Sequence, residues 1–113
     1  MLKERIEILK STKVISEETA GYVCSVIDEL QKEFAEKVSE MEMFTTHLAM
    51  ATQRTLDHEE VETLDDVIWE DVLTSQVFDK ASEMCEEIAA KAPCEFSDGE
   101  KRFLIMHLCN LNQ

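Results

Sequence analysis

Apolar residues recur every three or four positions along most of the chain, which is the spacing of amphipathic helices. The stretch from Met41 to Arg54 contains neither Gly nor Pro, and Phe44, Leu48 and Ala51 fall on one stripe of it. A second stripe runs through residues 16–36, so both segments are predicted to be helices. Its apolar members are Ala20, Val23, Cys24, Ile27, Leu30 and Phe34.

Serine residues followed by acidic residues mark where three helices are expected to begin. Ser16 is a suitable N-cap because the two glutamates that follow it complement the positive end of the helix dipole. Ser39 and Glu42 have the spacing of a capping box, in which each side chain bonds the other residue's backbone amide. Ser97 and Glu100 have the same spacing, which predicts a third helix start.

The last of these helices, over about residues 97–110, is apolar almost all round and is therefore expected to be buried. Upstream of it, residues 62–76 are ambiguous; their pattern is compatible with a short helix in which Ile68, Val72 and also Trp69 face inward. A longer helix follows and ends near Ala92, because the residue before Pro93 avoids the helical conformation.

The first segment of the chain is less regular. Residues 1–15 form a charged lead-in in which Leu2, Ile6 and Leu9 lie at helical spacing, a pattern compatible with a short helix or a mobile arm. The remainder, residues 16–113, shows no linker or internal repeat and is predicted to be one domain. Gly occurs twice and Pro once, which favours an all-α fold, a compact bundle of about five helices.

Charge narrows the classes of partner. The 25 acidic residues outnumber the 11 basic ones and give a net charge of −14. Such a surface repels phosphate backbones and anionic membranes, so neither nucleic acid nor membrane is expected to bind directly. It suits a partner with a basic docking face. No apolar run is long enough for a membrane span or a signal peptide, so a cytoplasmic location is expected.

The cysteines give no sign of a metal site. They are widely scattered, without a Cys-x-x-Cys pair, and are interpreted as free thiols of a reducing compartment. The histidines also lack the spacing of metal ligands, so no metal and no cofactor are expected. The four cysteines are Cys24, Cys85, Cys94 and Cys109.

Two histidines stand out because each lies inside an apolar helix. His47 and His107 are in this position, whereas His58 lies in an acidic run and is expected at the surface. One interpretation is a pair of core histidines whose nitrogens are hydrogen-bonded. No strained nucleophile or phosphate-binding loop is present, so an enzyme is not expected. The chemistry left for an accessible imidazole is accepting a proton or a phosphoryl group, with Arg54 orienting the ring or pairing with the added anion.

The segment from His47 to Arg54 resembles the first histidine motif of PTS regulation domains, with Ala51 at +4 and Arg54 at +7. The segment from Glu100 to Asn110 is similar to the second motif of the same family, with Glu at −7 and Asn at +3 of the histidine. The two histidines are 60 positions apart, as in that family, and the resemblance spans roughly residues 16–110.

The resemblance implies a five-helix bundle built on antiparallel helix pairs, with the two histidines near one another. It implies that His47 and His107 are phosphoacceptors supported by Arg54, Glu100 and Asn110. The expected donor is the histidine-containing phosphocarrier protein or a sugar-permease component. In that family, phosphorylation shifts the packing of a homodimer and so switches an attached antiterminator or transcription regulator.

Two features depart from the family pattern. Thr46 stands where many members carry Asp just before the first histidine. A chain of 113 residues filled by one such domain has no room for an effector module, so a stand-alone regulator acting through a partner is expected. The rival hypothesis is an acidic helical dimer that scaffolds a basic partner without covalent chemistry. A metal-binding regulator is a third, and it requires further ligands around the two histidines.

Overall fold

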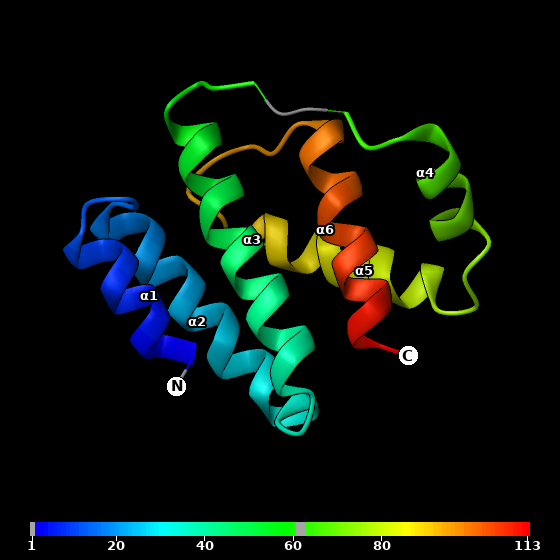
Figure 1. Cartoon of the computed structure of the whole chain (residues 1–113), viewed down its shortest axis with the longest axis horizontal. Helices are drawn as coiled ribbons and strands as arrows, with labels where there is room; N and C mark the ends of the chain where they lie inside the picture. The colour runs from blue at the N-terminus through cyan, green and yellow to red at the C-terminus, as the bar shows by residue number, and fades with distance from the viewer. Residues whose placement is uncertain (1, 61–62) are drawn as a thin grey trace.

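Six helices make up the part of the chain that the computed structural model describes, residues 2–60 and 63–113 (Figure 1). The all-α class is confirmed, and the expected number of about five helices is one too low, because the lead-in is itself a helix. The helices are α1 (Leu2–Ser11), α2 (Glu17–Phe34), α3 (Val38–Leu56), α4 (Asp66–Leu73), α5 (Phe78–Ala90) and α6 (Asp98–Leu111).

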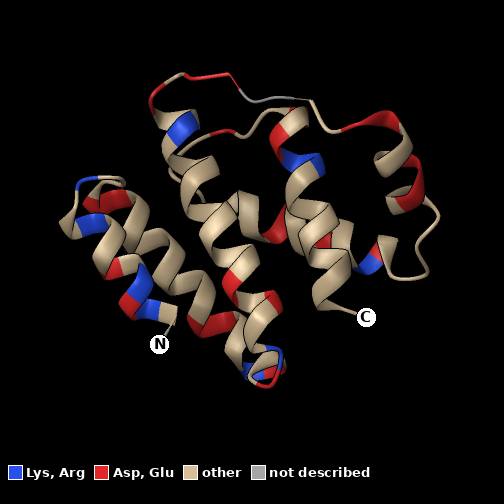
Figure 2. Ribbon diagram, in the orientation of Figure 1, with Lys and Arg blue, Asp and Glu red and all other residues tan. Residues whose placement is uncertain are grey.

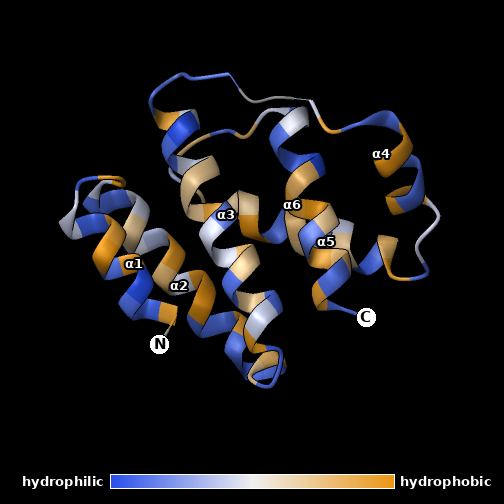
Figure 3. Ribbon diagram, in the orientation of Figure 1, coloured by the Kyte–Doolittle hydropathy of each residue, from blue (hydrophilic) through white to orange (hydrophobic). Residues whose placement is uncertain are grey.

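Helix α1 packs against α2 and α3 and belongs to the same hydrophobic core. Its apolar side chains Leu2 and Ile6 are buried, Ile6 completely. The three helices run alternately up and down, so α1 and α2, and α2 and α3, are antiparallel neighbours (Figure 1). The alternation of hydrophobic and hydrophilic positions along α1 and α2 accounts for this arrangement (Figure 3). Of the two possibilities left open for the lead-in, the structure has the helix.

Helix α6 lies among α3, α4 and α5 and packs against each of them. Its buried residues include Leu104 and Leu108, which join Phe44 and Leu48 of α3 in the core. The prediction of a central, heavily buried last helix is therefore confirmed. Because α6 runs antiparallel to α3, the end of α3 faces the start of α6 (Figure 1).

Two of the three predicted helix starts are confirmed. The hydroxyl of Ser16 accepts a hydrogen bond from the amide of Thr19, and the hydroxyl of Ser97 accepts one from the amide of Glu100. The third is wrong, because α3 begins at Val38, one residue before the exposed Ser39.

Helix α4 is capped by the side chain of Asp65, which accepts a hydrogen bond from the amide of Val67. Its Val72 is buried as predicted, whereas Ile68 is 45% exposed and does not face inward.

Acidic residues are spread over the helices and over the loop that follows α3 (Figure 2). In the part of the chain described, no helix combines the length and the apolar composition needed to cross a membrane. Two of the cysteines, Cys85 and Cys109, are buried, the other two are partly buried, and all four are free thiols.

Candidate functional site

The two histidines of the apolar helices meet across the α3–α6 interface. His47 comes from the middle of α3 and His107 from the second half of α6. Their ring centroids are 4.9 Å apart and the ring planes are tilted by 43°. The antiparallel packing of two helices thus brings together residues that are 60 positions apart in the sequence.

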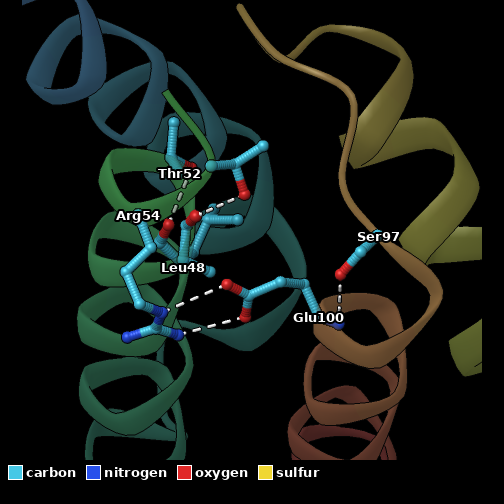
Figure 4. A network of polar contacts seen from close by, with 7 residues as sticks. Leu48, Thr52, Arg54, Ser97 and Glu100 are labelled. Carbon is cyan, nitrogen blue, oxygen red and sulfur yellow. Dashed lines mark hydrogen bonds and ion pairs between the residues drawn. The ribbon is translucent and has the colours of Figure 1, made fainter. Parts of the chain in front are cut away.

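A partly buried ion pair joins the same two helices two turns away from the imidazoles. The Nε and Nη2 atoms of Arg54 donate to the two carboxylate oxygens of Glu100 at 3.1 and 3.0 Å (Figure 4). Glu100 is only 2% exposed. Two parallel bonds between planar groups fix both distance and orientation, so this pair sets the register of α3 against α6.

The capping box predicted at the start of α6 is therefore half right. Ser97 caps the helix, but the carboxylate of Glu100 bonds Arg54 of α3 (Figure 4). Sequence reasoning named Arg54 and Glu100 separately and did not predict that they pair. The available signal was the spacing, because Arg54 lies seven residues after His47 and Glu100 lies seven residues before His107. Seven residues are about two turns of helix.

The buried hydroxyls of α3 are satisfied within the helix. Thr52 donates to the carbonyl of Leu48 at 2.7 Å (Figure 4), and Thr45 donates to that of Met41 at 2.8 Å. The imidazole of His47 differs from them. Its Nε2 atom is buried and has no hydrogen-bond partner among the described residues. Leaving such a group unsatisfied costs about 1–3 kcal/mol, which sets this nitrogen apart from the satisfied hydroxyls of the same helix.

Phe103 forms the third side of the site and was not among the predicted residues. Its ring centroid lies 5.5 Å from that of His47, and it precedes His107 by one turn of α6. The helical spacing of Phe103 and His107 was the available signal, since residues four apart share a helix face.

The surroundings keep both imidazoles neutral near pH 7. Burial, with smaller contributions from His107 and from the Arg54 guanidinium, lowers the pKa of His47 from 6.5 to about 4. Burial also lowers the pKa of His107 below its usual value. A neutral imidazole has one ring nitrogen with a free lone pair, which makes it a potential nucleophile.

Residues 21–111 match the sequence profile of the PRD domain family, and this match covers most of the chain. The chain belongs to the PRD domain family. Both histidines, the arginine and the glutamate lie within the matched part of this PRD domain. PRD domains are regulatory domains. Searches among curated proteins and among solved structures found no match.

Three further residues of the PRD domain that the sequence singled out are Asn110, His58 and Thr46. Asn110 is exposed, and no hydrogen bond joins its side chain to another described residue. His58 is exposed in the loop after α3, as predicted. The hydroxyl of Thr46, the residue before the first histidine, accepts a hydrogen bond from Arg5 of α1 at 3.1 Å.

The site also lacks the composition of a metal centre. Within residues 2–60 and 63–113, no three His, Cys, Asp or Glu side chains come together as metal ligands would. The groups that the site offers are two neutral imidazoles in contact, with the Arg54–Glu100 ion pair two turns away along the same helices.

Proposed function

We propose that this PRD domain is a phosphorylation-responsive regulatory module of the bacterial sugar phosphotransferase system. It accepts phosphoryl groups on His47 and His107 and in response regulates transcription or a partner protein. It works as a homodimer, and its phosphoryl donor is the phosphocarrier protein or a sugar-permease component. The domain is a receiver of phosphoryl groups and not an enzyme.

The contact between the two imidazoles is the observation that supports this proposal most strongly. The rings are 4.9 Å apart, are neutral near pH 7, and lie in a family of regulatory domains. A phosphoryl group on either ring adds roughly 1.5 to 2 negative charges, if it behaves like other phosphorylated side chains. The added charge would interact electrostatically with the neighbouring ring, so phosphorylation of one histidine is coupled to phosphorylation of the other.

The chemical step is a transfer between histidines. The free ring nitrogen of the acceptor attacks phosphorus, and an N–P bond forms while the N–P bond to the donor's imidazole breaks. The donor's leaving nitrogen takes up the proton that the acceptor ring loses. Arg54 is the nearby cation that can pair with the new phosphoryl oxygens, once it is released from Glu100.

The buried Nε2 atom of His47 suggests how modification becomes a signal. A phosphoryl group cannot be added to this atom while α6 covers it, and a doubly charged group is costly to bury. The closed arrangement therefore represents the unphosphorylated state. Phosphorylation at Nε2 favours a second arrangement in which α3 and α6 separate at the histidines.

The test is phosphotransfer in a purified system. The protein is incubated with phosphoenolpyruvate and the general phosphotransferase enzymes, and its intact mass is measured. We expect an acid-labile phosphoryl adduct that the double variant His47→Ala, His107→Ala does not form. His58→Ala is the matched control and should be labelled like the wild type, since His58 is exposed outside the site. A wild-type protein that gains no adduct from phosphocarrier or permease component would refute the proposal.

The rival function, an acidic scaffold with inert core histidines, is less well supported. It requires imidazoles whose nitrogens are satisfied by hydrogen bonds, whereas Nε2 of His47 has no partner among the described residues. Metal analysis of the purified protein separates the third hypothesis from both.

A further inference from the structure

A groove of about 480 Å³ separates α2 from α5. It lies between two contacts that join these helices. The hydroxyl of Tyr22 donates to the carbonyl of Ile88 at 2.7 Å, and Lys80 forms an ion pair with Glu33 at 2.7 Å. The two contacts show that the helices run antiparallel. The first contact is roughly 16 Å from the second along α2, at 1.5 Å per residue.

The floor of the groove is apolar. Val26 and Leu30 of α2 and Met84 and Ile88 of α5 line it. Val26 and Leu30 are buried, and the two α5 side chains are partly buried against the core. Residues four apart lie one turn apart on the same helix face, so each helix presents a continuous apolar stripe to the groove.

Carboxylates line both rims of the groove. Glu29 and Glu33 stand on the α2 side, and Glu83 and Glu87 stand on the α5 side; all four are exposed. The α2 pair is partly neutralised by Lys32 and Lys80. No ion pair engages either α5 glutamate within the described parts of the chain. The α5 rim therefore has two carboxylates, one turn apart, that are available to a cation.

From this arrangement we propose that the α2–α5 groove binds a basic amphipathic helix of a partner protein. About three turns of helix match the distance between the two contacts, at 5.4 Å per turn. Its apolar residues at i, i+3, i+4 and i+7 would occupy the floor, a recurring mode of helix recognition. Lysine or arginine on its flanks would pair with the glutamates of the rims.

A second copy of this chain is a poorer occupant than a basic partner. Each copy has a net charge of −14, and the groove itself has four carboxylates and two lysines on its walls. Bringing a second acidic surface against these rims adds like-charge repulsion, which disfavours the wrong partner by several kcal/mol. The proposal is independent of histidine phosphorylation, because the groove contains neither histidine.

The probe is a synthetic amidated peptide of leucine and lysine, about twelve residues long, with leucines at helical spacing. Its binding is followed by fluorescence anisotropy and by the backbone amide shifts of the protein. A peptide of the same composition with its leucines scrambled around the helix separates groove binding from charge attraction. We expect the patterned peptide to bind about tenfold more tightly than the scrambled one, with amide shifts concentrated in residues 25–33 and 80–91.

The protein variants change the rim and the opening separately. The double variant Glu83→Gln, Glu87→Gln should weaken peptide binding about tenfold. The control variant Glu59→Gln, Glu60→Gln removes the same charge from the loop after α3 and should weaken binding less than about twofold. Ser25→Trp, an exposed lining residue, should obstruct the groove without loss of helix content. Binding should be unchanged in the variant that lacks His47 and His107, which separates this proposal from the proposed function.

The proposal is overturned by any of three results. Equal weakening by the two glutamine pairs would mean that net charge alone attracts the peptide. Amide shifts centred on other helices would place the peptide elsewhere. A concentration-dependent dimer that Ser25→Trp abolishes would assign the groove to a second copy of the chain.

Discussion

His47 combines a titratable ring with a buried nitrogen that has no hydrogen-bond partner. Its pKa of about 4 in the folded protein is below its ordinary value of 6.5. The unfolded chain therefore binds the proton first as the pH falls. The stability that depends on a neutral His47 is complete above about pH 6.5 and is lost toward pH 4.

The first prediction follows from this linkage. Lowering the pH from 7 to 4 should reduce the free energy of unfolding of both proteins. The reduction should be roughly 2 kcal/mol smaller in His47→Gln than in the wild type, after allowance for partial solvent screening. Urea denaturation at several pH values measures the difference, and the variant cancels the contributions of the carboxylates. Parallel pH profiles for the two proteins would contradict the lowered pKa.

The Arg54–Glu100 pair provides the second prediction. Arg54→Ala should destabilise the protein by about 3 kcal/mol, because it leaves a buried carboxylate without its cation. The double variant Arg54→Met, Glu100→Met removes both charges and should stay within about 1 kcal/mol of the wild type. Chemical denaturation of the single and double variants gives the coupling energy. A double variant as unstable as the single one would mean that the aliphatic parts of the two side chains contribute more to stability than their charges.

Among the elements, α6 is the helix whose start is best defined. Ser97 accepts the amide hydrogen bond of Glu100 at 3.2 Å, whereas Ser39 is exposed inside the first turn of α3 and makes no cap. The third prediction is that Ser97→Ala costs about 1 kcal/mol and Ser39→Ala less than about 0.5 kcal/mol. Thermal unfolding of the two variants measures this. A larger loss at Ser39 would mean that α3 begins later than Val38.

Helix α1 is tied to the rest of the domain by its apolar side chains. Ile6 is fully buried, while Ile8 on the same helix is 63% exposed. The fourth prediction is therefore a loss of about 2–4 kcal/mol for Ile6→Ala and of less than about 0.5 kcal/mol for Ile8→Ala. Both variants have the same change in helix propensity, so their difference in denaturation midpoint isolates burial.

The helix starts that could be predicted from the sequence were those where a long apolar stripe coincides with a local cap. Helices α2 and α6 have both, and their capping serines were identified correctly. The α1 helix could not be decided because its burial depends on α2 and α3, which a local pattern does not contain. The predicted cap at Ser39 was wrong for a related reason, since the spacing of a capping box also occurs one position inside a helix. The predicted inward orientation of Ile68 was wrong because α4 has only eight residues, too few for a clear apolar stripe.

The candidate site was predictable only as far as its motifs reach. His47 and His107 were recognised from two motifs, and the structure places the two rings in contact. The bond between Arg54 and Glu100 and the packing of Phe103 on His47 depend on how α3 and α6 lie against one another. Glu100 had two possible partners, the amide of Ser97 on its own helix and the guanidinium of Arg54. The second offers two charge-assisted bonds in a buried place, and it prevails.

For the whole molecule, the net charge of −14 is the dominant electrostatic fact. Repulsion among the acidic residues opposes the compact state, and salt screens it. The fifth prediction is that the midpoint of thermal unfolding rises by about 4 °C, equivalent to about 1 kcal/mol, between low salt and about 0.5 M NaCl. Scanning calorimetry measures it. A midpoint that falls with salt would mean that surface ion pairs, such as Lys3 with Asp28, outweigh the repulsion.

The contact between α3 and α6 also determines when the paired site can form during synthesis of the chain. Synthesis proceeds at about 5–20 residues per second, so roughly 3–12 s separate the appearance of His47 from that of His107. During that interval α1, α2 and α3 can pack together, while the face of α3 that α6 will cover stays open to solvent. His47 is then an ordinary exposed histidine with its ordinary affinity for protons. The paired site is the last part of this domain to come into existence.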